Sequence, residues 1–223
     1  MSELPASTET RNRLLTAAAM EILDVGYAGA SLAKIAARIG HTKGSLGYHF
    51  PTKETILDAL LERCEETDQR AAERAETAFP DSPMRQLLAF IASYSFISSI
   101  DPATAAASLL AHDPSVPYSY GRATHLLWQQ RLEGYLDAAQ QQEGYQFTVS
   151  TKVAAQRILV AVTGFAVTAR FYDDDEPRPR LSHLKPCLAA LPVPDVDSVI
   201  ADVKAADFFF QVDPSGETIP LSE

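Results

Sequence analysis

A short polar segment, Thr42 to His49, carries the residue types that bind another molecule without covalent chemistry. Nearly every position in it is polar or small, and only Leu46 and the following Phe50 are plain core anchors. Lys43 can reach a phosphate or a guanine edge, and Tyr48 can contact a phosphate or a thymine methyl group. This composition is typical of a surface that touches nucleic acid.

Glycines and helix starts favour the same interpretation. Gly44 and Gly47 each disfavour a helix by about 1 kcal/mol relative to alanine, so a helix that only packed would not need them. Helix N-termini are expected at Ser31, Thr42 and Lys53, where free backbone N–H groups attract phosphate. The candidate DNA contacts are Ser31, Thr42, Lys43, Gly44, Ser45, Tyr48, His49 and Lys53.

The rest of the chain lacks a catalytic constellation. It has no glycine-rich nucleotide loop, no His-Glu-x-x-His motif and no nucleophile elbow, and its five histidines form no cluster. The acidic run Asp173–Glu176 lacks the glycine and spaced ligands of a calcium loop, so a solvated loop is the better interpretation. We expect no enzyme activity, no metal and no cofactor.

Aromatic and polar residues on otherwise apolar helices form a second candidate site. Phe90 and Tyr94 share one helix face, and Trp128 and Tyr135 belong to another stripe. Converging side chains of this kind suit a cavity for a small molecule with polar and apolar parts, although they could equally fill the core. The candidate ligand-binding residues are Trp128, Phe90, Tyr94, His125, Thr163 and Phe165.

Charge is unevenly distributed along the 223 residues. The whole chain has a net charge of −10, whereas residues 1–55 hold six basic and five acidic residues. A local DNA-binding face is therefore compatible with the acidic total. With two unrelated cysteines, no visible signal peptide and no apolar stretch of membrane-spanning length, we expect a cytoplasmic protein with no membrane partner.

The elements that must position these residues all read as helices. Apolar residues recur at helical spacing, and Ser, Thr, Asp, Gly and Pro occur where helices begin and end. The expected fold is all-α, with an N-terminal three-helix helix-turn-helix domain over 1–51 and a helical effector-binding and dimerisation domain over 52–223. The expected helices after Gly40 cover 42–49, 52–78, 82–100, 101–112, 118–142, 150–172, 181–191 and 196–210.

The first fifty-odd residues resemble the TetR family of bacterial transcription regulators. The resemblance rests on the runs Thr10–Leu15, Gly26-Tyr27, Ser31–Ala36 and Lys43–Glu54, and Gly47 departs from it because the family commonly has an aromatic residue there. Family members are usually homodimeric repressors that release operator DNA when a small molecule fills a C-terminal pocket. The resemblance thus implies double-stranded operator DNA, a small-molecule effector and a homodimer as partners.

A finer similarity concerns the effector. Residues 127–136 and 162–165 are similar to the γ-butyrolactone receptors, a TetR subgroup in which a tryptophan lines the autoregulator pocket. This implies a γ-butyrolactone or butenolide signal that controls antibiotic biosynthesis. Two alternatives stay open: a TetR-like regulator of a xenobiotic or lipid response, and a helical ligand carrier or enzyme whose N-terminal domain does not bind DNA.

Overall fold

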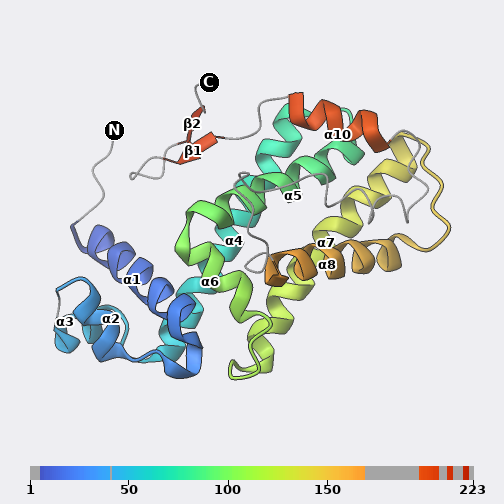
Figure 1. Cartoon of the computed structure of the whole chain (residues 1–223). Coiled ribbons are helices and arrows are strands. Elements are labelled where there is room, and N and C mark those ends of the chain that lie inside the picture. Colours follow the sequence, from blue (N-terminus) through green and yellow to red (C-terminus); the bar gives the residue numbers. More distant parts are fainter. Residues whose placement is uncertain (1–5, 41, 169–195, 206–209, 213–217, 221–223) are drawn as a thin grey trace. The chain divides into compact units, whose positions relative to one another are not determined.

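The computed structural model describes residues 6–40, 42–168, 196–205, 210–212 and 218–220. Figure 1 shows the helices and strands with the labels used below. In chain order they are α1 (Ala6–Gly29), α2 (Leu32–Arg38), α3 (Lys43–His49), α4 (Lys53–Ala78), α5 (Pro83–Ile100), α6 (Pro102–Leu110), α7 (Tyr118–Gln142), α8 (Thr151–Thr168), α10 (Val196–Ala205), β1 (Phe210–Val212) and β2 (Thr218–Pro220). The prediction of an all-helical fold is confirmed.

Local capping explains several helix starts. The Ser31 hydroxyl accepts a hydrogen bond from the Lys34 N–H and opens α2. The Asp101 carboxylate accepts a hydrogen bond from the Ala103 N–H and opens α6, whose first residue is Pro102. Gly26 adopts a φ of 73°, a left-handed conformation that interrupts α1 near its end.

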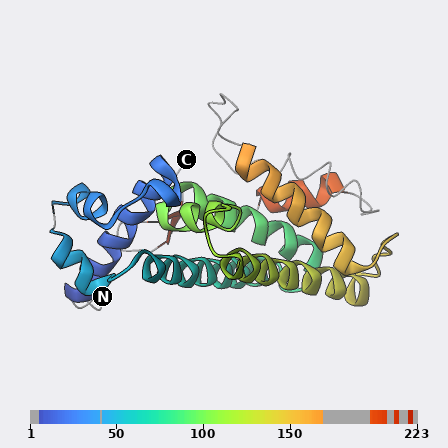
Figure 2. The same ribbon diagram turned by 90° about the horizontal axis from the view of Figure 1, so that it is seen from below.

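The first compact unit comprises residues 1–66 and 101–124. Within it α6 packs against α1, and α2 packs against both α1 and α3. Figure 2 shows α2 and α3 beside α1 from a second direction. The core of this unit includes the side chains of Leu14, Ile35, Leu46, Phe50 and Leu60, each at most 1% exposed.

The second compact unit comprises residues 67–100 and 125–223. Here α10 packs against α5, and Arg85 of α5 donates two hydrogen bonds to the Asp202 carboxylate of α10, at 2.9 and 2.5 Å. The N-terminus of α5 is capped by a residue that is distant in the sequence. The Glu143 carboxylate accepts hydrogen bonds from the Met84 N–H at 2.9 Å and from the Ser82 hydroxyl at 2.6 Å. Long-range polar contacts therefore hold α5 within this unit.

Some predicted boundaries differ from the structure. The helix expected over 196–210 ends at Ala205, and Phe210 instead begins a strand that pairs antiparallel with β2. The chain after this expected helix also contains β2. The helix expected over 181–191, the end of the helix expected over 150–172 and the acidic run 173–176 lie outside the described residues.

The two compact units do not follow the predicted functional division at residue 51. Residues 52–66 and 101–124 group with the N-terminal helices, because α6 packs on α1 although it lies far along the chain. The functional division stays a prediction. Within the described segments, no single helix is long and apolar enough to cross a membrane, and only the bent pair α5–α6, taken together, passes that test.

Candidate nucleic-acid interface and aromatic cluster

The recognition-helix candidate α3 is held from one side only. Leu46 is fully buried and Phe50, just after the helix, is 1% exposed. On the opposite side Gly44 is exposed and the Tyr48 side chain is 82% exposed. The i, i+4 spacing of Gly44 and Tyr48 places them on one helix face. The structure therefore turns one side of α3 to the core and leaves the other available for a partner.

The other predicted contacts on α3 have distinct surroundings. Thr42 is exposed just before the helix, and the half-buried His49 ring stands edge-on to the Tyr48 ring, with 5.1 Å between centroids. The side chains of Lys43 and Ser45 lie outside the described part of the structure.

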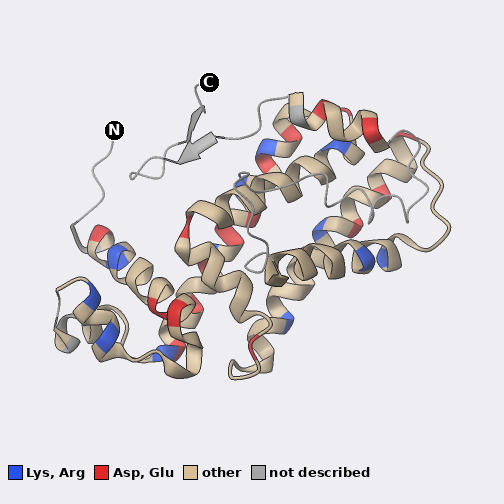
Figure 3. Cartoon of the chain, in the orientation of Figure 1, with Lys and Arg blue, Asp and Glu red and all other residues tan. Residues whose placement is uncertain are grey.

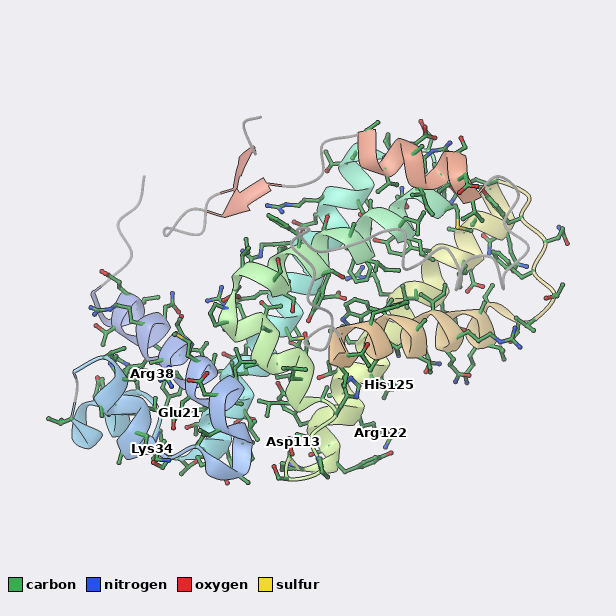
Figure 4. The ribbon with its side chains drawn as sticks, viewed as in Figure 1. Glu21, Lys34, Arg38, Asp113, Arg122 and His125 are labelled. Atoms are coloured by element: carbon green, nitrogen blue, oxygen red, sulfur yellow. The ribbon has the colours of Figure 1, made fainter. Side chains whose placement is uncertain are left out.

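The helix-turn-helix is fixed to α1 by an ion-pair network. The Arg38 guanidinium of α2 lies 3.0 Å from the Glu21 carboxylate and 2.5 Å from the Asp24 carboxylate, both on α1. Hydrogen bonds to Asp24 and Glu21 raise the pKa of Arg38, which keeps its charge in place. Figure 4 labels Arg38, Glu21 and the nearby Lys34, which is exposed. Lys34 is not among the candidate DNA contacts predicted from the sequence.

Two other cations in this unit have partners inside the protein. Lys53 donates a hydrogen bond to the Tyr27 carbonyl oxygen, and its ammonium lies 4.2 Å from the centroid of the Tyr27 ring. Arg11 lies over the Phe50 ring at 5.2 Å and pairs with Glu62 at 3.2 Å. Figure 3 shows that α1 carries both basic and acidic residues, so the charged positions of this unit are not uniformly basic.

The second candidate site contains a cluster of four aromatic rings, defined here as the aromatic cluster: Phe90, Tyr94, Trp128 and Tyr135. Centroids are 5.1 Å apart for Phe90 and Trp128, 4.5 Å for Tyr94 and Trp128, and 5.9 Å for Phe90 and Tyr135. All four residues are at most 6% exposed. The structure thus brings together Phe90, Tyr94 and Trp128 from α5 and α7 and adds Tyr135 to them.

The remaining predicted ligand residues are less enclosed. The His125 side chain is exposed, and Thr163 and Phe165 on α8 are half-exposed. His125 lies three positions before Trp128, which is buried in the aromatic cluster. The spacing of three places both residues on one face of α7, but it does not predict that one is exposed and the other buried.

Polar groups near the aromatic cluster are buried with incomplete pairing. Asp68 of α4 is 1% exposed, and Arg131 of α7 donates two hydrogen bonds to its Oδ2, at 3.2 and 2.8 Å. Among the described residues the Asp68 Oδ1, the Ser93 hydroxyl and the Tyr135 hydroxyl are buried without a hydrogen-bond partner. Burial raises the pKa of Asp68, which Arg131 partly offsets, and burial also raises the pKa of Tyr135. Unpaired buried groups of this kind are unusual and call for a partner.

The N-terminal part of the chain is similar to known proteins. Residues 14–60 match the family of bacterial regulatory proteins, tetR family. The HTH-type transcriptional regulator TtgR of Pseudomonas putida is 36% identical over 83 residues, which are 36% of this chain and 40% of TtgR. The matched stretch therefore spans two fifths of the length of that curated relative.

Solved structures match over most of the chain. A γ-butyrolactone receptor (ArpA-like protein) has a TM-score of 0.72 at 21% identity and covers 91% of this chain and 98% of its own, which shows the fold alone. SmeT, the repressor of the Stenotrophomonas maltophilia multidrug efflux pump SmeDEF, has a TM-score of 0.64 at 25% identity in its complex with triclosan, covering 84% of this chain and 93% of its own. The match over residues 14–60 therefore confirms, for this N-terminal stretch, the family predicted from the motifs, that of bacterial regulatory proteins of the tetR family.

Proposed function

We propose that the chain is a transcriptional regulator that reads double-stranded DNA with α3. The observation that supports this most is that α3, within residues 14–60, packs on the core by one side only. Its Leu46 is buried, and its Tyr48 is 82% exposed. A helix held in this way can enter a major groove. The proposed contacts are Ser31, Thr42, Lys43, Gly44, Ser45, Tyr48 and His49.

Lys53 is assigned a positioning role in this proposal. Its ammonium is engaged by the carbonyl oxygen and the ring of Tyr27, so it ties the start of α4 to the end of α1. In a homodimer, the two N-terminal DNA-binding domains would reach half-sites one helical turn apart, roughly 34–36 Å. Because residues 1–55 carry a net charge of only +1, one domain alone would bind weakly and the dimer would supply specificity.

The chain offers a matched pair of tyrosines for testing DNA binding. Tyr48 on α3 and Tyr118 at the start of α7 are both 82% exposed. Fluorescence anisotropy would be measured on DNA from upstream of the gene and on DNA selected from a random pool, with a shuffled duplex as control. We expect Tyr48→Ala to weaken specific binding at least tenfold, about 1.4 kcal/mol, and Tyr118→Ala to leave it unchanged.

The outcomes separate the classes of function. Equal loss in both variants, or none in either, would contradict a reading role for α3. Wild-type protein that selects no sequence and binds all duplexes equally would reject DNA-specific regulation and favour a ligand carrier.

We further propose that the protein is a repressor released by an effector that binds at the aromatic cluster. The four contacting rings offer an apolar wall, and the unpaired Tyr135 hydroxyl and Asp68 Oδ1 offer polar groups. The helix α4 runs from the first unit, which ends there at Glu66, into the second unit at Thr67. It is the proposed lever, since a tenfold loss of operator affinity needs only about 1.4 kcal/mol of differential binding.

The proposed effector class is a γ-butyrolactone or butenolide signal, with control of antibiotic biosynthesis as its biological context. The similarity of residues 127–136 to the receptors of such signals and the place of Trp128 in the aromatic cluster support it. The likeness in fold to a γ-butyrolactone receptor is compatible with it. A xenobiotic effector is the second candidate, supported by the similarity to SmeT, which was solved with triclosan.

Trp128 makes the effector testable because it is the only tryptophan. A synthetic γ-butyrolactone and triclosan would be titrated separately while the fluorescence of Trp128 and the anisotropy of labelled operator are followed. A ligand that contacts the aromatic cluster should quench the fluorescence and release DNA over the same concentration range. DNA release without any change in Trp128 fluorescence would place the effector elsewhere.

A further inference from the structure

Gly47, in the second half of α3, has no explanation within the described structure. Its backbone is not among the glycines with positive φ, which are Gly26, Gly40 and Gly144. A Cβ atom built on Gly47 would meet no described atom within 4 Å. Among the described atoms, neither a special backbone conformation nor close packing therefore requires a glycine at this position.

Gly121 differs from Gly47 in this respect. A Cβ on Gly121 would lie 2.5 Å from the backbone carbonyl oxygen of Ala111, so packing demands glycine there. At Gly47 the space is open, and alanine would favour the helix because glycine is among the least favourable residues in a helix interior. With only seven residues, α3 has few hydrogen bonds to compensate. Local rules broken in this way are expected at functional sites.

The place of Gly47 on α3 indicates which neighbour would use the open space. It follows the fully buried Leu46 and precedes the 82% exposed Tyr48, and it is itself half-exposed. Since successive residues are turned by about 100°, Gly47 lies on the flank between the anchored side and the outward face. A molecule approaching that outward face would meet bare backbone beside the Tyr48 ring.

We propose that Gly47 is a specificity-determining position, at which the bare backbone of α3 comes into van der Waals contact with a base edge in the major groove. This rests on the proposed DNA-binding function and extends it to one position. The base edge fills the volume that a Cβ would occupy, so the contact discriminates by shape, as apolar contacts to thymine methyl groups do. Any side chain at this position moves the helix away from that base pair.

The test uses two alanine variants of the full-length chain. Gly47→Ala is compared with Gly134→Ala, because Gly134 is exposed within α7 and a Cβ there would also meet nothing within 4 Å. Duplexes are first selected from a random pool by the wild-type protein. The dissociation constants of all three proteins for the best duplex and a shuffled one are then measured by anisotropy, and melting temperatures by differential scanning calorimetry.

We expect Gly47→Ala to keep or raise the melting temperature while it weakens DNA binding. Both variants should melt at the wild-type temperature or about 2 °C above it. Gly47→Ala should bind the selected duplex at least tenfold more weakly, and Gly134→Ala within twofold of wild type. Selection repeated with Gly47→Ala should change the preferred base at one position in each half-site.

Three outcomes would overturn the proposal. If the wild-type protein binds selectively and Gly47→Ala has the same affinity and base preference, the role of Gly47 is rejected and the DNA-binding function stands. A lower melting temperature for Gly47→Ala would mean that the glycine serves the fold. Failure of the wild-type protein to select any sequence would reject the proposed function itself, together with this inference.

Discussion

At the scale of single residues, Lys53 shows how a charged side chain can serve the fold at a position where DNA contact was predicted. Its ammonium lies 4.2 Å from the Tyr27 ring centroid and donates to the Tyr27 carbonyl oxygen. Tyr27 is 8% exposed, so the pair forms at the edge of the core. A lysine with two internal partners has little freedom to follow a phosphate.

Lys53→Met therefore tests whether this charge acts inside the protein or on DNA. We expect the free energy of unfolding to fall by about 1–2 kcal/mol, through loss of the cation–π contact and the hydrogen bond. The slope of log affinity against log salt concentration should stay unchanged. A lost phosphate contact would instead reduce that slope by about 0.9. The exposed Lys34→Met variant serves as the comparison, with wild-type stability expected.

Two glycines on α7 provide a second prediction at this scale. A Cβ at Gly121 would lie 2.5 Å from the Ala111 carbonyl oxygen, whereas one at Gly134 would meet nothing within 4 Å. We expect Gly121→Ala to lower the free energy of unfolding by about 1–3 kcal/mol, because backbone must move. Gly134→Ala should raise it by up to about 1 kcal/mol. Urea unfolding of both variants decides this, and equal effects would contradict the close approach at Gly121.

At the level of the elements, α4 and α7 are joined by an ion pair in which only one carboxylate oxygen has a hydrogen-bond partner. Arg131 satisfies the Oδ2 of Asp68, whose side chain is 1% exposed, and leaves its Oδ1 unpaired. Burial raises the pKa of Asp68 and Arg131 lowers it again in part. Without Arg131, the buried Asp68 carboxylate would lose the charged partner that offsets the cost of its burial.

Arg131→Met should destabilise the protein by about 3 kcal/mol at neutral pH. The sign of the pH dependence follows from the raised pKa of Asp68, which rises further once Arg131 is gone. Such a group contributes stability below its unfolded pKa of about 3.9, and that contribution is lost as the pH rises through its folded pKa. The deficit relative to wild type should thus shrink from pH 8 towards pH 5 in urea unfolding. A deficit independent of pH would mean that lost packing dominates.

The predicted elements and the observed ones agree where local signals suffice. Ser31 caps α2 and Asp101-Pro102 opens α6, as the sequence indicated. The helix predicted over 196–210 failed at its end, where Phe210 pairs with Pro220 in a strand. A run of apolar residues near a chain end does not distinguish helix from strand, because only the partner segment decides.

At the scale of the whole molecule, the proposed homodimer needs an apolar surface that a single chain leaves open. Ile158 and Leu159 of α8 do not form such a surface, because both are buried within the chain itself. Val160 on the same helix is 70% exposed, and Val153, seven residues earlier and on the same face, is 37% exposed. These two valines mark the face of α8 that a second copy would cover.

Val160→Glu is expected to shift the protein from dimer to monomer in sedimentation velocity at micromolar concentration. A buried unpaired carboxylate opposes association, and the symmetry of a dimer places it in the interface twice. Leu109→Glu, at a 43% exposed leucine of α6, should leave the sedimentation coefficient unchanged. A Val160→Glu protein that stays dimeric would exclude this face of α8 from the interface.

Caps, glycines and apolar periodicity act over one or two turns, so they were enough to predict the described helices, most of their ends and the buried position of Leu46 on α3. Local signals could not predict that Lys53 binds Tyr27, that Glu143 caps α5 or that Asp68 pairs with Arg131, 63 residues away, because these contacts form only when the helices pack. The tertiary structure also decided that Trp128 enters the aromatic cluster while His125 stays exposed. These contacts join distant segments, and which segments meet depends on the packing of whole helices, which no local pattern specifies.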